Sequence, residues 1–276
     1  QVRNYLDFSD AYFDEDSYLA SVNVAHNLAS LYFRAFDEKF VEEIRSYAIN
    51  YFRKILSNLG WEPKKSDKHT DALLRTFAIA VLGKMNDETV TDEAIKKYKK
   101  FLKSPRSLSP DLIETICSIA AWNGNSKTFA ELKKLYTNAK TMEEKLRFLG
   151  AMCGFQDKKL LVKTLDFSQT SAVRSQNMQL PIMKIAGNPY GDKVLWPWLK
   201  KNWKKINKKV GHGNPLFNRI VASIAGVADD SMEKEIKLFF KNNPTPGTER
   251  TQSQTLERIR INSKFLRTMR KEFKNG

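Results

Sequence analysis

The sequence is poor in the residues that covalent scaffolds and metal sites require. It contains two cysteines and three histidines in 276 residues, which excludes a disulfide framework and favours a reducing, cytoplasmic compartment. The histidines, His26, His69 and His212, are too far apart to share one helical face, so the HExxH zinc pair is absent. No segment approaches the ~18 uninterrupted apolar residues of a membrane span, so we expect no membrane partner.

The residues that could still carry chemistry have simpler interpretations. Asp67, His69 and Asp71 lie close together at the expected start of a helix, where polar residues more often act as caps than as metal ligands. Cys117 and Cys153 lie in apolar stretches without a neighbouring histidine, so we interpret them as small buried side chains. The sequence therefore gives no catalytic residue, no metal ligand and no cofactor in this chain.

Charge is abundant and uneven. Lysine and arginine number 47 against 31 acidic residues, a net charge of +16. Residues 1–50 hold nine acids and four bases, a net of −5, so the basic surplus lies later in the chain. A surplus of this size favours anionic partners and says nothing about the fold.

Helical periodicity dominates the sequence. Apolar residues recur every three or four positions in 42–60, where Gly60 is expected to end the helix. Pro110 is expected to open another helix, and Thr141 with Glu144 has the spacing of a capping box. We predict roughly a dozen such helices, no strands, and an all-α fold. Short helices with short joints favour an α-solenoid of antiparallel helix pairs with a concave inner face, and a compact irregular bundle is the alternative.

The segment GNPYGDKVLWPWLKKNWKKINKK (187–209) combines three tryptophans with a run of lysines. On a helix, Trp196, Trp203 and Ile206 share one face while most of the lysines lie on the other. Stacking of nucleic-acid bases would need aromatic and basic side chains on the same surface. The pattern therefore favours a core stripe bordered by lysines and does not favour nucleic acid as a partner. Pro197 suggests that the helix begins near Val194 or bends at the proline.

Four segments resemble the C-terminal helical domain of the M1 zinc aminopeptidases, in the same order. They are LGWEPKKSDKHTDALLR (59–75), AVRSQN (172–177), GNPYGDKVLWPWLKKNW (187–203) and NPTPGTERTQSQTLERIRINSKFL (243–266). The sequence is most similar to the puromycin-sensitive and archaeal tricorn-interacting aminopeptidases. The resemblance implies that residues 1–276 form a single α-helical C-terminal domain with HEAT-like helix pairs. Because the chain begins with Gln1, we also expect it to be a piece of a longer protein whose catalytic domain lies upstream.

The resemblance implies a function and two site residues. The catalytic domain of that family carries the zinc ion, HExxH and a GxMEN-type motif, and this chain has neither motif. The chain would instead cap the catalytic domain, enclose a peptide chamber and gate access of the substrate. Arg219 matches a position where several family members place an arginine facing the cleft, and Arg174 is a second candidate for binding the peptide. For each arginine, a structural salt bridge between helices is the alternative. For the whole chain, the alternative is a free-standing basic helical-repeat adaptor that binds RNA or an acidic protein.

Overall fold

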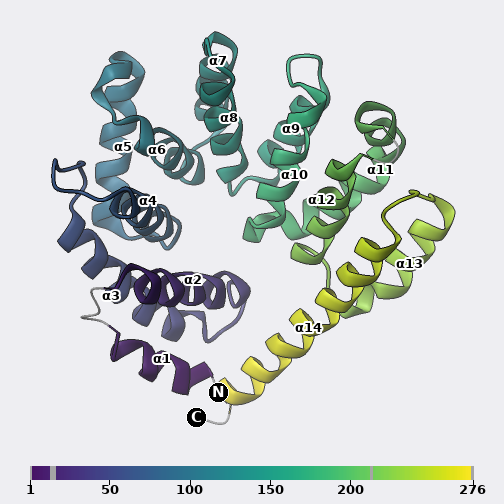
Figure 1. Ribbon diagram of the computed structural model, residues 1–276, viewed down its shortest axis with the longest axis horizontal. Helices are drawn as coiled ribbons and strands as arrows, with labels where there is room; N and C mark the ends of the chain where they lie inside the picture. Colours follow the sequence, from purple (N-terminus) through teal and green to yellow (C-terminus); the bar gives the residue numbers. More distant parts are fainter. Residues whose placement is uncertain (1, 13–16, 212–213, 275–276) are drawn as a thin grey trace. The chain divides into compact units, whose positions relative to one another are not determined.

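The computed structural model describes residues 2–12, 17–211 and 214–274, and every regular element in that part of the chain is a helix. The α-helices are α1 (Val2–Asp10), α2 (Tyr18–Arg34), α3 (Val41–Leu59), α4 (His69–Lys84), α5 (Glu88–Lys103), α6 (Pro110–Trp122), α7 (Ser126–Asn138), α8 (Met142–Ala151), α9 (Lys158–Gln169), α10 (Gln179–Ala186), α11 (Asp192–Val210), α12 (Pro215–Ser223), α13 (Glu233–Asn242) and α14 (Glu249–Lys274). Figure 1 shows them in chain order. The prediction of an all-α fold is confirmed.

Several helix ends follow local rules that the sequence already displays. Gly60 follows α3 with a φ of 69°, a backbone conformation that glycine adopts without steric cost. Thr141 and Glu144 form the predicted capping box, with the Glu144 amide 3.2 Å from the Thr141 hydroxyl. Pro110 is the first residue of α6. Capping and glycine stops therefore set these boundaries before any tertiary contact is considered.

The chain divides into two compact units. Unit 1 consists of Gln1–Ala120 and Leu266–Gly276, and unit 2 of Ala121–Phe265. In unit 1, α2 packs on α3, α3 on α4 and α4 on α5, so neighbours in sequence are neighbours in space. Their shared core includes Leu28, Phe52 and Ile79, all fully buried.

Unit 2 repeats this arrangement with more helices. Two rows can be followed: α9 packs against α11 in one row, while α10 packs against both α8 and α12 in the other. Contacts of α10 with α9 and α11 join the two rows. Successive helices therefore stack as pairs within unit 2, as predicted for HEAT-like repeats. The concave inner face stays a prediction.

Aromatic side chains from three helices form the core at one end of unit 2. Trp203 of α11 lies edge-on to Phe217 of α12 and to Phe239 of α13, with ring centroids 5.1 and 5.2 Å apart. Trp196 lies edge-on to Phe239 at 5.1 Å. Such edge-to-face pairs are a favourable geometry beyond the area they bury. This cluster fixes α11 against α12, the helix that carries Arg219.

Candidate functional site

The tryptophans of α11 belong to the core and its lysines to the surface. Trp196 and Trp203 are each 2% exposed and Ile206 is fully buried, whereas Lys201 and Lys205 are exposed. The predicted division of the two faces is confirmed. The helix begins at Asp192, two residues before the predicted start near Val194, and continues through Pro197, where a bend stays a prediction. It can do so because the proline lies on the exposed face and removes only one backbone hydrogen bond.

Arg219 lies on the exposed side of a short, well-anchored helix. The side chain of Asn214 caps α12 by accepting a hydrogen bond from the Leu216 amide at 3.0 Å. Phe217 and Ile220 are buried on either side of Arg219 in the sequence, and Arg219 itself is exposed. Among the described residues, the Arg219 guanidinium makes no hydrogen bond or ion pair. The capped helix holds the backbone of Arg219 in place, and the guanidinium group is free to bind a ligand.

Arg174 lies in the turn between α9 and α10, directly before the 3-10 turn η3 (Ser175–Asn177). Two helices hold this turn in place. Tyr136 of α7 donates its hydroxyl hydrogen to the Ala172 carbonyl at 2.9 Å, and burial raises the pKa of Tyr136 while the positive charge of Arg174 opposes that rise. Lys209 of α11 donates to the carbonyl of Val173 at 3.0 Å.

Lys209 donates hydrogen bonds to more than one backbone carbonyl. Its ammonium group also donates to the carbonyls of Ser168 and Thr170, at 3.0 and 2.8 Å. Burial lowers the pKa of Lys209. These carbonyls end α9, where a positive charge also complements the helix dipole. No pattern in the sequence indicates this role, because Lys209 is one of several similar lysines in this part of α11.

The two predicted arginines do not form one cluster. Arg219 lies on α12 and Arg174 in the turn after α9, and they share no hydrogen-bond partner among the described residues. Arg174, like Arg219, is exposed and without an ion pair in the part of the chain that the structure describes. The alternative of a salt bridge between helices is therefore not realised here. Their role in binding a peptide stays a prediction.

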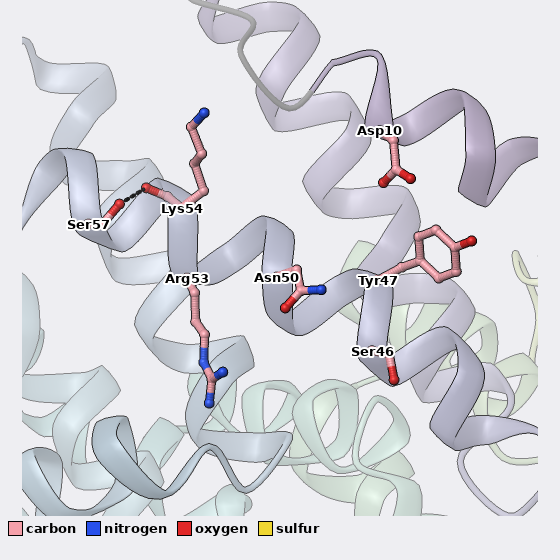
Figure 2. A pocket seen from close by; sticks show the side chains of 7 residues that line it. All are labelled: Asp10, Ser46, Tyr47, Asn50, Arg53, Lys54 and Ser57. Atoms are coloured by element: carbon pink, nitrogen blue, oxygen red, sulfur yellow. Dashed lines mark hydrogen bonds between the residues drawn. The ribbon is translucent and has the colours of Figure 1, made fainter.

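A polar hollow of about 490 Å³ lies on unit 1 (Figure 2). Six of its seven lining residues come from α3, and Asp10 comes from the end of α1. Tyr47 donates its hydroxyl hydrogen to Asp7 at 3.2 Å, which raises the pKa of Tyr47. Arg53 is paired with the buried Asp87 at 2.6 Å. Tyr47 and Arg53 therefore make structural bonds, and the described side chains that line the hollow do not pair a nucleophile with a general base, since the Ser46 and Ser57 hydroxyls donate to backbone carbonyls.

Several of the residues first weighed as metal ligands or nucleophiles have structural roles. Asp71 accepts a hydrogen bond from the Lys68 amide at 2.9 Å, at the start of α4, and this confirms its interpretation as a cap. His26 stacks on Phe77 with ring centroids 4.4 Å apart. Cys117 and Cys153 are buried, and burial raises the pKa of the Cys117 thiol. His212 lies outside the described residues. Within the described ranges, no three histidine, cysteine, aspartate or glutamate side chains are grouped to hold a metal ion.

Sequence reasoning missed the role of Arg75. This arginine of α4 is 1% exposed, and its guanidinium donates to the carbonyls of Gly60 and Leu59 at 3.0 and 3.2 Å and pairs with Asp67. It fastens the loop after α3 to α4. A signal was present, because Arg75 lies three and four residues before the buried Ala78 and Ile79, on the apolar stripe of its helix.

No helix in the described part of the chain combines the length and the apolar character that crossing a membrane requires.

Comparison with known proteins gives one consistent result. The family model for the ERAP1-like C-terminal domain matches residues 1–261. Aminopeptidase M1-D of Oryza sativa subsp. japonica is 28% identical to this chain over 94% of it and 30% of the relative. Aminopeptidase M1 of Arabidopsis thaliana is 26% identical over 86% of the chain and 27% of the relative. Aminopeptidase 2, mitochondrial, of Saccharomyces cerevisiae is 24% identical over 95% of the chain and 28% of the relative. The chain thus spans less than a third of these curated relatives.

Proposed function

Because the chain belongs to the ERAP1-like C-terminal domain family, we propose that it is the non-catalytic cap of an M1 aminopeptidase, enclosing a peptide chamber and gating substrate access. The observation that carries this proposal is the match of residues 1–261 to that family, together with relatives of which the chain spans 27 to 30%. The proposed partner is the catalytic domain of the same protein. Closure of such a cap would exclude water and complete the site around the peptide.

The zinc ion of the proposed enzyme belongs in the part of the protein outside this chain. The described residues offer no fitting set of ligands, since none of their histidine, cysteine or carboxylate side chains form a group of three. The contribution of this chain would be to bind and position the peptide. A cytoplasmic location stays a prediction, and one relative is named as mitochondrial.

The match to one family over residues 1–261 extends across both units, which supports the proposal that 1–276 work as a single domain. Scanning calorimetry tests this directly. A single domain predicts one unfolding transition whose calorimetric and van't Hoff enthalpies agree. Two resolved transitions would show that the units unfold independently.

Arg219 is the proposed contact for the far end of the peptide. An exposed guanidinium without an ion pair could bind the peptide's terminal carboxylate or an acidic side chain through two parallel hydrogen bonds. Arg174 is proposed as a secondary contact, since its turn is held by Tyr136 and Lys209.

The whole protein that contains this chain gives the decisive assay. Arg219→Ala should raise KM for a peptide of about ten residues roughly tenfold, as expected for loss of one charge-assisted contact. Turnover of a short chromogenic substrate, which cannot reach the cap, should not change. Arg106→Ala is the matched control, because Arg106 is also an exposed arginine but belongs to unit 1, whereas α12 belongs to unit 2. Equal effects of the two variants, or equal loss on both substrates, would contradict the role of Arg219.

The cap role itself is tested by titrating this chain into the isolated upstream portion of the same protein. Saturable changes in peptide turnover support a cap. If turnover ignores the chain at every concentration, the adaptor function becomes the better proposal. RNA binding would then be measured over a salt series, because phosphate contacts weaken steeply as salt rises.

A further inference from the structure

A groove that could serve as a second binding surface lies on unit 2, in the row of helices that does not contain α12. A groove of about 860 Å³ runs between α9 and α11, two helices that Figure 1 shows as neighbours. We call it the lysine groove and define it by its five lysines: Lys158, Lys159, Lys193, Lys201 and Lys205. Arg219 belongs to the other row, so this groove is separate from the peptide contact proposed above.

The positive charge of the lysine groove is largely uncompensated. Its lining contains those five lysines and one acidic residue, Asp166. All five lysines are exposed, and among the described residues none of their ammonium groups makes a hydrogen bond or an ion pair. In contrast, Lys200 on the same helix pairs with Glu235, and Lys209 holds three carbonyls. The groove therefore holds five lysines without a structural partner among the described residues, and it would attract an anionic ligand.

Positive charge gathers at the two ends of the groove. The helices α9 and α11 run in the same direction. The Trp198 indole donates to Asp166 at 2.8 Å, and further along both helices Lys209 donates to the Ser168 carbonyl. Lys158 and Lys193, in the first turns of α9 and α11, therefore mark one end, together with the positive ends of two helix dipoles. Lys201 and Lys205 mark the other end.

The middle of the groove is different. Val162 and Pro197 contribute apolar surface there, next to the largely buried Trp198, and the carboxylate of Asp166 also lines this part of the groove. Because Pro197 has no N–H, the carbonyl of Lys193 lacks its usual helical donor. The side-chain amide nitrogen of Gln169, which also lines the groove, is buried without a hydrogen-bond partner among the described residues.

These features point to one class of ligand. The span from Lys158 to Gln169 is about 16 Å at 1.5 Å per helical residue, which an extended peptide covers with about five residues. We propose that the lysine groove binds an extended acidic segment of another protein, with carboxylates at both ends and an apolar side chain in the middle. A nucleic-acid strand fits less well, because its phosphates would meet Asp166 and the buried Trp198 offers no face for base stacking.

The probe is a fluorescein-labelled peptide, Gly-Glu-Glu-Leu-Glu-Glu-Gly, and the readout is fluorescence anisotropy with the full chain. Binding should be saturable and should weaken as salt rises from about 50 to 200 mM, because exposed charges are screened. Replacing the central leucine by serine should weaken binding by roughly three- to tenfold, as expected for one apolar side chain lost from the middle of the groove. Replacing the four glutamates by glutamine should abolish it.

The chain offers a matched pair of variants. K201E with K205E reverses two charges inside the groove and should weaken binding by at least roughly tenfold. K204E with K208E makes the same change on the same helix, at exposed positions outside the groove lining, and should have less than about a threefold effect. Circular dichroism melts of both variants check that they fold alike.

Three results would overturn the proposal. The first is equal loss of binding in both variant pairs, which would mean that the peptide responds only to the overall charge. The second is a five-nucleotide single strand that binds more tightly than the peptide and loses affinity in K201E with K205E, which would make the groove a nucleic-acid site. The third is no peptide binding up to about 1 mM at low salt, an affinity too weak for a specific segment.

Discussion

The largest fully buried side chain of unit 1 differs in chemistry from those of unit 2. Unit 1 encloses a guanidinium, that of Arg75, which bonds to two backbone carbonyls and to Asp67. Unit 2 encloses the indoles of Trp196 and Trp203, which pack against phenylalanine rings. Apolar packing depends on shape and volume, whereas a buried ion pair depends on both partners being present and charged. The two units should therefore respond differently to mutation and to pH.

The largest expected effect is in the aromatic cluster. Trp203→Ala should lower the free energy of unfolding by about 3–5 kcal/mol, because it leaves a large cavity among the rings of α12 and α13. The measurement is chemical denaturation followed by circular dichroism. Trp203→Phe is the control, and it should cost less, since it also removes an indole N–H that has no partner among the described residues. Similar losses for alanine and phenylalanine would argue against packing as the cause.

A somewhat smaller effect is expected from Arg75→Met. This change keeps much of the buried volume but leaves Asp67 and the carbonyls of Leu59 and Gly60 without their donor, at a cost of about 3 kcal/mol. The double variant Arg75→Met with Asp67→Asn should recover part of that loss if the pairing matters. If the losses in free energy of unfolding of the two single variants simply add in the double variant, Arg75 acts through packing alone.

The smallest effect concerns pH. Hydrogen bonding from the Lys64 amide, and then from Arg75, holds the pKa of Asp67 below its usual value of 3.8, although desolvation opposes the shift. The stabilisation is therefore present above pH 3.8 and is lost as pH falls through the lowered value in the folded protein. In unit 2, bonds from Arg260 and Lys237 hold the pKa of Glu233 at about 2.

Thermal melts between about pH 7 and pH 2 separate these two carboxylates. The difference in Tm between the wild type and Asp67→Asn should begin to shrink below pH 3.8. The difference for Glu233→Gln should begin to shrink below the usual pKa of 4.5 and should be lost as the pH approaches 2. A difference that stays constant over the whole range would mean that the ionised carboxylate contributes nothing to stability.

Local patterns predicted much of the fold, because they need only neighbouring residues. The stop at Gly60, the capping box of Thr141 and Glu144, and the buried face of Trp196 and Trp203 all follow from spacing along one helix. The ion pair of Glu233 with Arg260 joins residues of two helices, and no local pattern selects those partners.

The candidate site was less predictable for the same reason. The assignment of Arg219 and Arg174 came from a family resemblance, and the structure adds that both are exposed and without an ion pair among the described residues. The lysine groove needs α9 and α11 side by side, so residues about 35 positions apart act together. Periodicity places lysines on the surface, but it does not say which surfaces face each other.

Because of Lys209, the lysines of α11 should differ in how well they tolerate substitution. Three carbonyl oxygens converge on one ammonium group, and a planar guanidinium cannot reproduce that arrangement. In a library that randomises the lysines of α11, Lys204 and Lys208 should drift freely, while position 209 should return lysine and reject even arginine. Selection would then show one invariant lysine in a segment whose composition suggests that all of its lysines are interchangeable.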